Sequence, residues 1–129
     1  MNHDTTMRAA LQAAKLRQEF IDWLRADADK LVSAAQLLGG QRGEDRAISV
    51  IDAIDFGVEP EELGADLAKL HRLMTLEYID DLNGEEALYF IAVHPDDPGL
   101  EDTRLCAEGL ERGLKVLRAH AAALNQEVS

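Results

Sequence analysis

The fold is decided by residues 99–125, GLEDTRLCAEGLERGLKVLRAHAAALN, in which apolar and small side chains recur at alternating spacings of three and four. Such spacing places one narrow stripe along a helix of about seven turns, as in the seam of a helical bundle or coiled coil. We therefore predict a long C-terminal helix whose heptad-patterned stripe packs in the core or at a dimer seam. The stripe consists of Leu100, Thr103, Ala107, Leu110, Leu114, Leu117, Ala121 and Leu124.

Two glycines, Gly109 and Gly113, lie four residues apart on the flank of this stripe. A glycine inside a helix costs about 1 kcal/mol relative to alanine. We expect this cost to be offset by the close approach of another helix.

Residues 5–38 form a second long helical segment, because they contain neither glycine nor proline and end at Gly39-Gly40. An unbroken helix of this length would measure about 50 Å, longer than a small bundle can cover. We expect either that its N-terminal turns project or that it bends near residues 25–29. The apolar positions with helical spacing are Ala13, Leu16, Phe20, Trp23, Leu24, Ala28, Leu31, Ala35 and Leu38.

The remaining segments complete an all-α bundle of about five helices within a single domain, residues 1–129. Residues 87–93, ALYFIAV, are rich in residues that favour strands, but the chain contains no second strand candidate to pair with them. An isolated strand would leave its backbone polar groups unsatisfied, so we predict a short buried helix instead. After a loop at 39–43, the further predicted helices are 44–56, 60–81 and 85–94.

The chain is strongly acidic, with 25 Asp and Glu residues against 13 Lys and Arg and a formal net charge of −12. A charge of this size places a negative field over much of the surface, which repels nucleic-acid phosphates and anionic membranes. We expect no direct nucleic-acid binding and no membrane association. A protein partner with a basic face would be attracted.

Compartment and chemistry are constrained by what the sequence lacks. A single cysteine, Cys106, cannot form a disulfide within the chain, and we expect no secretory signal, so the predicted location is the cytoplasm. None of the histidines follows a glutamate at the Glu-x-x-His spacing of di-metal bundles, and one cysteine is a poor basis for a zinc site. We find no phosphate-binding loop or activated nucleophile, and we expect no cofactor, no metal and no enzymatic activity.

The candidate partner-binding surface is an acidic pole of the bundle. If neighbouring helices are antiparallel, carboxylates from two helix starts gather at one end. Many of them also stabilise helix N-termini, but capping does not account for two carboxylates between Pro95 and Pro98. The residues expected at this pole are Glu59, Glu61, Glu62, Asp96, Asp97, Glu101 and Asp102.

An alternative site is His71, in the run His71-Arg72-Leu73-Met74-Thr75. An acidic helical domain of about this length with one exposed histidine resembles histidine phosphotransfer domains, and that resemblance implies a phosphoacceptor role for His71. The family typically has His-x-Leu-Lys-Gly, whereas Met74 and Thr75 stand here in place of the Lys and Gly. The alternative interpretation is a half-exposed surface histidine beside the core positions Leu70 and Met74.

These features predict a small protein-binding module, an adaptor, inhibitor or neutralising partner of a basic target. Toxin-neutralising immunity proteins, nucleic-acid mimics and chaperones for secreted proteins share this profile of size, charge and helicity. The alternatives are phosphotransfer at His71 and a structural homo-oligomer, with a homodimer formed through the long helices.

Overall fold

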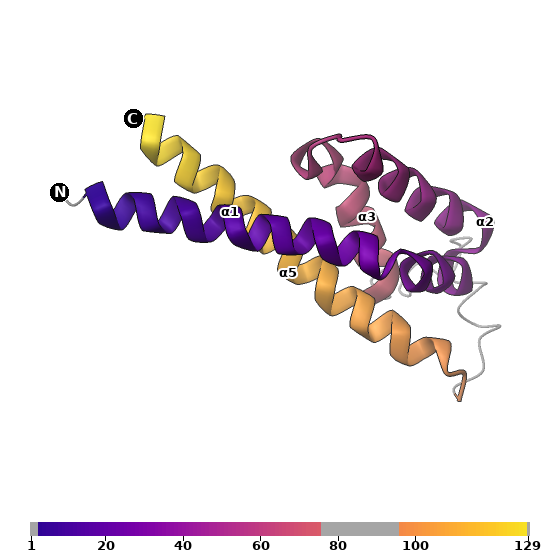
Figure 1. Ribbon diagram of the computed structural model, residues 1–129. Coiled ribbons are helices and arrows are strands. Elements are labelled where there is room, and N and C mark those ends of the chain that lie inside the picture. Colours follow the sequence, from indigo (N-terminus) through magenta and orange to yellow (C-terminus); the bar gives the residue numbers. More distant parts are fainter. Residues whose placement is uncertain (1–2, 76–95, 129) are drawn as a thin grey trace.

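The computed structural model describes residues 3–75 and 96–128, and within them every regular element is helical. The all-α class is therefore confirmed. The predicted helix 85–94 and residues 76–81 of the helix 60–81 lie outside the described residues, so the count of five helices stays a prediction. The elements are α1 (His3–Ala26), α2 (Ala28–Asp55), the 3-10 helix η1 (Pro60–Leu63), α3 (Gly64–Thr75) and α5 (Gly99–Val128) (Figure 1).

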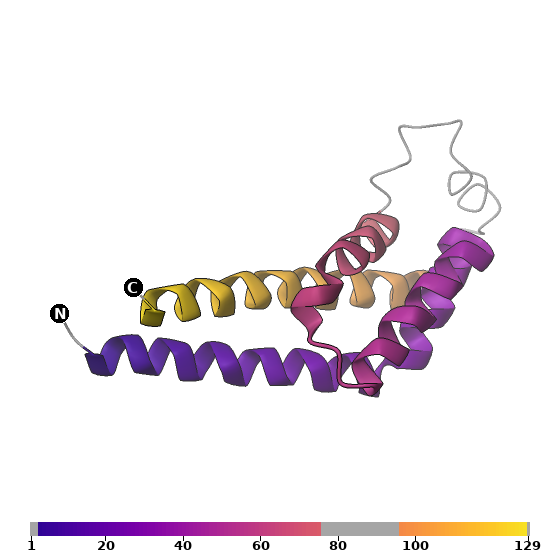
Figure 2. The same cartoon turned by 90° about the horizontal axis from the view of Figure 1, so that it is seen from above.

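The first predicted helix bends at Asp27, inside the range expected from the sequence. Asp27 has φ −104° and ψ 20°, and its side chain makes no capping hydrogen bond. Aspartate is a weak helix former, and the change of direction at this point ends α1 and starts α2. Up to the bend, α1 lies alongside α5; after the bend, α2 runs in a different direction from α1 (Figure 2).

A second change of direction occurs inside α2, at Gly40. This residue has φ 61° and ψ −148°, values that a side chain would strain, and it divides α2 into two helical parts. The predicted loop 39–43 is therefore wrong, because Gly40 alone turns the chain and its neighbours stay helical, with Gly39 and Gly43 buried. A Cβ atom on Gly39 would lie 2.9 Å from Leu73 Cδ2, and one on Gly43 would overlap the Ala35 carbonyl.

The two long helices α1 and α5 lie antiparallel, with the N- and C-terminal ends of the chain on the same side (Figures 1 and 2). A Cβ atom on Gly113 would overlap the Phe20 ring, and one on Gly109 would overlap the indole of Trp23. The expected close approach of a helix at these glycines is thus present, and α1 is that helix. The rings of Phe20 and Trp23 stack with their centroids 6.0 Å apart.

The buried side of α5 differs from the predicted stripe. Cys106, Gly109 and Gly113 are buried, whereas Leu114 is only partly buried and Ala121 is exposed. The helix is rotated because the aromatic rings of α1 occupy the space that the glycines leave open. The predicted positions Thr103, Leu110 and Leu117 belong to both patterns and are buried.

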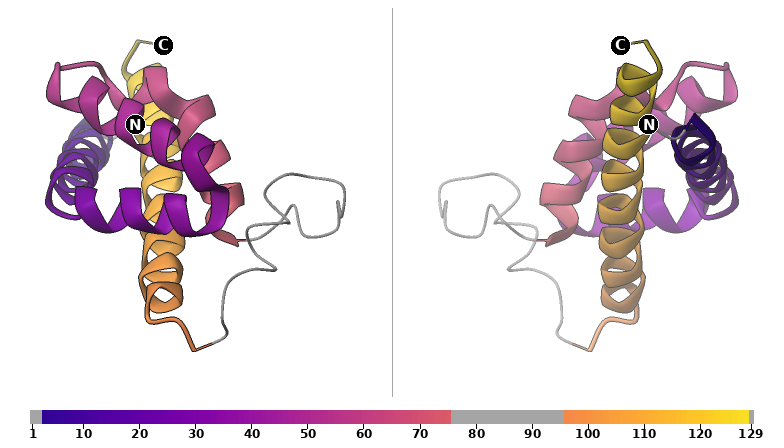
Figure 3. Two further views of the ribbon diagram at one scale, coloured as in Figure 1. Left: turned by 90° about the vertical axis from the view of Figure 1, so that its right-hand side faces the viewer. Right: turned by 90° about the vertical axis from the view of Figure 1, so that its left-hand side faces the viewer.

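One hydrophobic cluster takes side chains from all of these α-helices. α5 contacts α1, α2 and α3, and end-on views show it between α1 and α3 (Figure 3). Leu16, which the α1 pattern placed in the core, is 37% exposed and lies at the edge of this cluster. The largest fully buried side chains are Leu24, Leu31, Leu38, Leu67, Leu70, Leu110, Val50 and Pro60.

Replacing Gly113 by alanine should lower the free energy of unfolding by about 1 to 2 kcal/mol. The added methyl group overlaps the Phe20 ring, and overpacking of about 1 to 3 kcal/mol exceeds the gain in helix propensity of about 1 kcal/mol. Gly64→Ala is the matched control, because a Cβ atom there meets nothing within 4 Å and should stabilise α3 slightly. Urea denaturation compares the two variants, and equal midpoints would contradict the packing described for α1 and α5.

Candidate functional site

The acidic residues predicted to form one pole lie in two separate places. Glu61 lies beside His120 near the C-terminal end of α5, because His120 Nδ1 is 3.5 Å from Glu61 Oε1. Glu101 belongs to the first turn of α5, nineteen residues before His120, which corresponds to about 28 Å of helix. The single pole is therefore wrong as geometry: Glu59, Glu61 and Glu62 form one group, and Asp96, Asp97, Glu101 and Asp102 form another.

In the second group, Asp97 and Glu101 have structural roles. Asp97 Oδ1 accepts a hydrogen bond from the Gly99 backbone N–H at 2.8 Å and so caps the start of α5. Capping was not expected from the sequence to account for the carboxylates between Pro95 and Pro98, but for Asp97 it does. Glu101 pairs with Arg104, whose guanidinium lowers the pKa of the Glu101 carboxyl, and Arg104 also bonds Glu108 at 2.7 Å. Asp96 is exposed and Asp102 is partly buried.

In the first group, Glu59 and Glu61 form a polar cluster with Arg17 and His120. Arg17 Nε donates to Glu61 Oε1 at 2.5 Å, its Nη2 donates to Glu61 Oε2 at 2.9 Å, and Nη2 also bonds Glu59. These bonds lower the pKa of Glu61 and raise that of Arg17, whose side chain is only 17% exposed. The cluster ties η1 to both long helices, so it is primarily structural.

An exposed aromatic residue stands at the end of α2. Phe56 is 90% exposed and is followed by Gly57, whose φ of 91° turns the chain toward η1. Asp52 and Asp55 occupy the last turn of α2, which holds no basic residue, and carboxylates there oppose the helix dipole. We call this surface, formed by Asp52, Asp55, Phe56, Glu59 and Glu62, the Phe56 corner.

The charge of the Phe56 corner is only partly compensated by neighbouring cations. Arg25 Nε lies 3.2 Å from Asp55 Oδ1, but both side chains are more than half exposed, so the pair is weak. Together with Glu61, the corner sets five carboxylates against the two guanidinium groups of Arg17 and Arg25. Glu59 and Glu62 stand at the start of η1, where carboxylates are favourable, but no helix start explains Asp52 and Asp55, and core packing does not explain Phe56.

The position of Phe56 outside the apolar stripe is a signal that the sequence carries. The buried face of the second half of α2 carries Ala47, Val50 and Ile54. Phe56 follows Ile54 by two residues, which is about 200° around the helix, so it points away from that face. A large aromatic residue off the apolar stripe and beside two aspartates is an indication of a contact surface.

His71 lies in the middle of α3 and is partly exposed, and its neighbours Leu70 and Met74 are buried, as the core interpretation expects. Cys106 is buried, and burial raises the pKa of its thiol to about 11. Among the described residues, no group of three or more His, Cys, Asp and Glu side chains is arranged to hold a metal ion.

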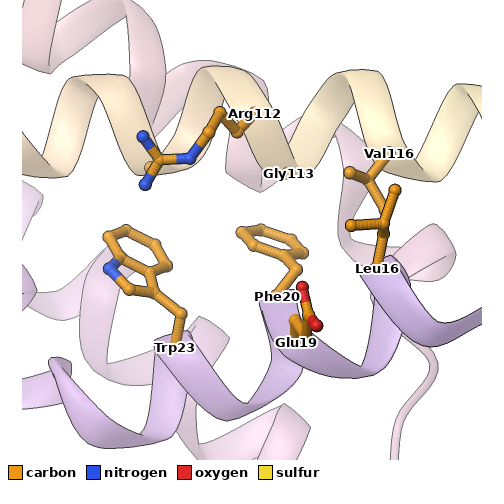
Figure 4. A pocket seen from close by; sticks show the side chains of 8 residues that line it. Leu16, Glu19, Phe20, Trp23, Arg112, Gly113 and Val116 are labelled. Carbon is orange, nitrogen blue, oxygen red and sulfur yellow. The ribbon is translucent and has the colours of Figure 1, made fainter.

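A groove with a volume of about 250 Å³ lies between α1 and α5 over the two glycines (Figure 4). Its floor is apolar and contains Phe20 and Trp23. Its rims carry one acidic side chain from α1, Glu19, and one basic side chain from α5, Arg112. Leu16 and Val116 extend the apolar lining.

Comparisons of this chain with protein-family models, with curated proteins and with solved structures give no match. Within residues 3–75 and 96–128, no helix has the length and apolar character needed to cross a membrane.

Arg17→Met should lower the free energy of unfolding by about 1 to 2 kcal/mol at pH 7, because it removes charge-assisted hydrogen bonds from a mostly buried guanidinium. The pKa of Glu61 is lowered in the folded protein, so its stabilising contribution is present above the unfolded-state pKa of about 4.3 and is lost as pH falls through the folded value. The difference in free energy of unfolding between the wild type and Arg17→Met should therefore become smaller toward pH 3. Urea denaturation at both pH values measures this, and a difference independent of pH would contradict it.

Cys106 should react slowly with a thiol-specific disulfide reagent at pH 8, because the thiolate is the reactive form and the raised pKa leaves little of it. The rate should rise to that of a free thiol in denaturant. Rapid modification of the folded protein would show that α5 opens locally and exposes this side chain.

Proposed function

We propose that this protein is a protein-binding module, an adaptor, inhibitor or neutralising partner, that uses an acidic surface to recognise a basic face on its target. The role is binding rather than catalysis, and the cytoplasm is its place of action. The observation that supports this proposal best is the Phe56 corner, because it combines an exposed aromatic side chain with Asp52 and Asp55, two carboxylates that oppose the dipole of α2.

The two components of the Phe56 corner have different roles in binding. The carboxylates attract a positively charged partner over a distance of about 10 Å at 0.1 M salt and so accelerate association. Phe56 supplies the apolar anchor that most interfaces need, since aromatic side chains surrounded by polar ones are common hot spots. A basic target with an apolar pocket between its cations fits both.

Two other functions remain as alternatives. Phosphotransfer would use His71 as phosphoacceptor, and a structural homo-oligomer would use the long helices. The group Asp96, Asp97, Glu101 and Asp102 also stays a candidate contact surface, although Asp97 caps α5 and Glu101 pairs with Arg104.

Partner capture from the native host at about 0.1 M salt tests the proposal, with the captured proteins identified by mass spectrometry. The neutralised corner, Asp52→Asn with Asp55→Asn and Glu62→Gln, should slow association about tenfold because electrostatic steering is lost. Phe56→Ala should instead accelerate dissociation about tenfold, as truncation of an anchor of about 1.4 kcal/mol does. Both rates are measured on a biosensor with the captured partner.

A matched control removes the same number of charges elsewhere, through Asp22→Asn, Asp45→Asn and Glu111→Gln, all at exposed positions. It should retain most of the association rate. Equal losses in the control and the neutralised corner would show that only net charge matters. Loss of activity in His71→Gln, or labelling of His71 by a phosphodonor, would favour phosphotransfer instead.

A further inference from the structure

The groove between α1 and α5 is an apolar surface that the described fold leaves uncovered. It exists because Gly109 and Gly113 bring no side chains to the space beside Phe20 and Trp23. The single tryptophan is only partly buried there, Leu16 is 37% exposed, and Leu105 on the same side of α5 is 43% exposed. An uncovered strip of this kind on two long helices is typical of an association surface.

The charges on the groove are balanced, unlike those of the chain as a whole. Glu19 stands on the α1 rim and Arg112 on the α5 rim (Figure 4). Neither of them forms an ion pair with another residue in the described part of the chain. The net charge of −12 would attract a strongly basic partner to other parts of the surface. At the groove, the attraction of such a partner to Glu19 is offset by its repulsion from Arg112.

The positions of these two charges suit a second copy of the same chain. Phe20 lies against Gly113 in an antiparallel helix pair, so Glu19 and Arg112, which each precede one of these two residues, lie on opposite sides of this contact. Their backbones are about 3 Å apart along the groove, an offset that two long side chains can span. A two-fold axis running along the groove lays α1 of one copy over α5 of the other. Each Glu19 then comes within reach of the long side chain of Arg112 in the other copy, which gives two equivalent ion pairs.

We infer that the α1–α5 groove is a self-association surface, at which two copies form a four-helix arrangement with reciprocal Glu19–Arg112 pairs. The core of this arrangement is filled by Leu16, Trp23, Leu105 and Val116 from both copies. The two helix pairs then cover each other's open side, as facing hairpins do in a four-helix bundle.

The interface is small, which sets the strength to expect. The apolar strip extends from Leu105 to Val116, about 17 Å of helix, so each copy buries less than the roughly 800 Å² of a standard interface. The dimer should therefore dissociate in the range of about 10 µM to 1 mM, and sedimentation equilibrium across this range detects it. Trp23 is the only tryptophan, so its emission should shift to shorter wavelength as the dimer forms.

Charge exchange tests the geometry. Glu19→Arg alone and Arg112→Glu alone each place like charges opposite one another and should raise the dissociation constant at least tenfold. The double variant restores two attractive pairs with reversed polarity and should return within about threefold of the wild-type value. A double variant as weak as the single ones, or a wild-type chain that stays monomeric at about 1 mM, would overturn the inference.

A pair of apolar substitutions tests the location. Leu16→Asp places a charge in the apolar lining of the groove and should abolish the dimer. Leu11→Asp is the control, because Leu11 is 65% exposed on a different face of α1 and its replacement should leave the dimer intact. Circular dichroism and urea midpoints check that both variants fold. Equal effects of the two variants on dimerisation would also overturn the inference, because the interface would then lie elsewhere on α1.

Discussion

The structure depends on the contact between two aromatic rings and two glycines. Phe20 and Trp23 stack on each other and lie against the backbone of α5 at Gly113 and Gly109. Removing a large aromatic side chain from such a site costs about 3 to 5 kcal/mol, a large share of the stability of a domain of this size. This contact sets the rotation of α5, and the rotation in turn decides which of its leucines are buried.

The polar groups supplement this apolar contact at a different place. Arg17, one turn before Phe20, holds Glu59 and Glu61 and so attaches η1 to α1. The chain therefore uses some of its carboxylates internally, although it carries far more acids than bases. What remains outside is unevenly distributed: the Phe56 corner is acidic, whereas the rims of the groove are balanced. On this difference rest the two contact surfaces that we propose, one for a basic partner and one for a second copy.

Much of the fold could be predicted from the sequence, because helical period and breaking residues are local signals. The bend near residues 25–29, the interruption of the helix at Gly39-Gly40 and the close approach at Gly109 and Gly113 all follow from residue type and position, although the loop predicted over 39–43 does not form. The rotation of α5 could not be predicted, since the spacing of leucines favoured one face and the rings of a distant helix favoured another. The separation of Glu61 from Glu101 could not be predicted for the same reason. The order of the helices suggests at which end of a bundle a loop lies, but only packing decides where along α5 the 3-10 helix η1 is placed.

The pairing of α1 with α5 also has a consequence for synthesis on the ribosome. Phe20 and Gly113 are 93 residues apart in the sequence. At a synthesis rate of about 5 to 20 residues per second, the rings of α1 are therefore made on the order of 5 to 20 s before the glycines that cover them. During that interval α1 and α2 are present without the helix that contacts all the others. The nascent chain therefore exposes an amphipathic helix with an uncovered aromatic pair, the kind of surface that chaperones recognise, until α5 emerges.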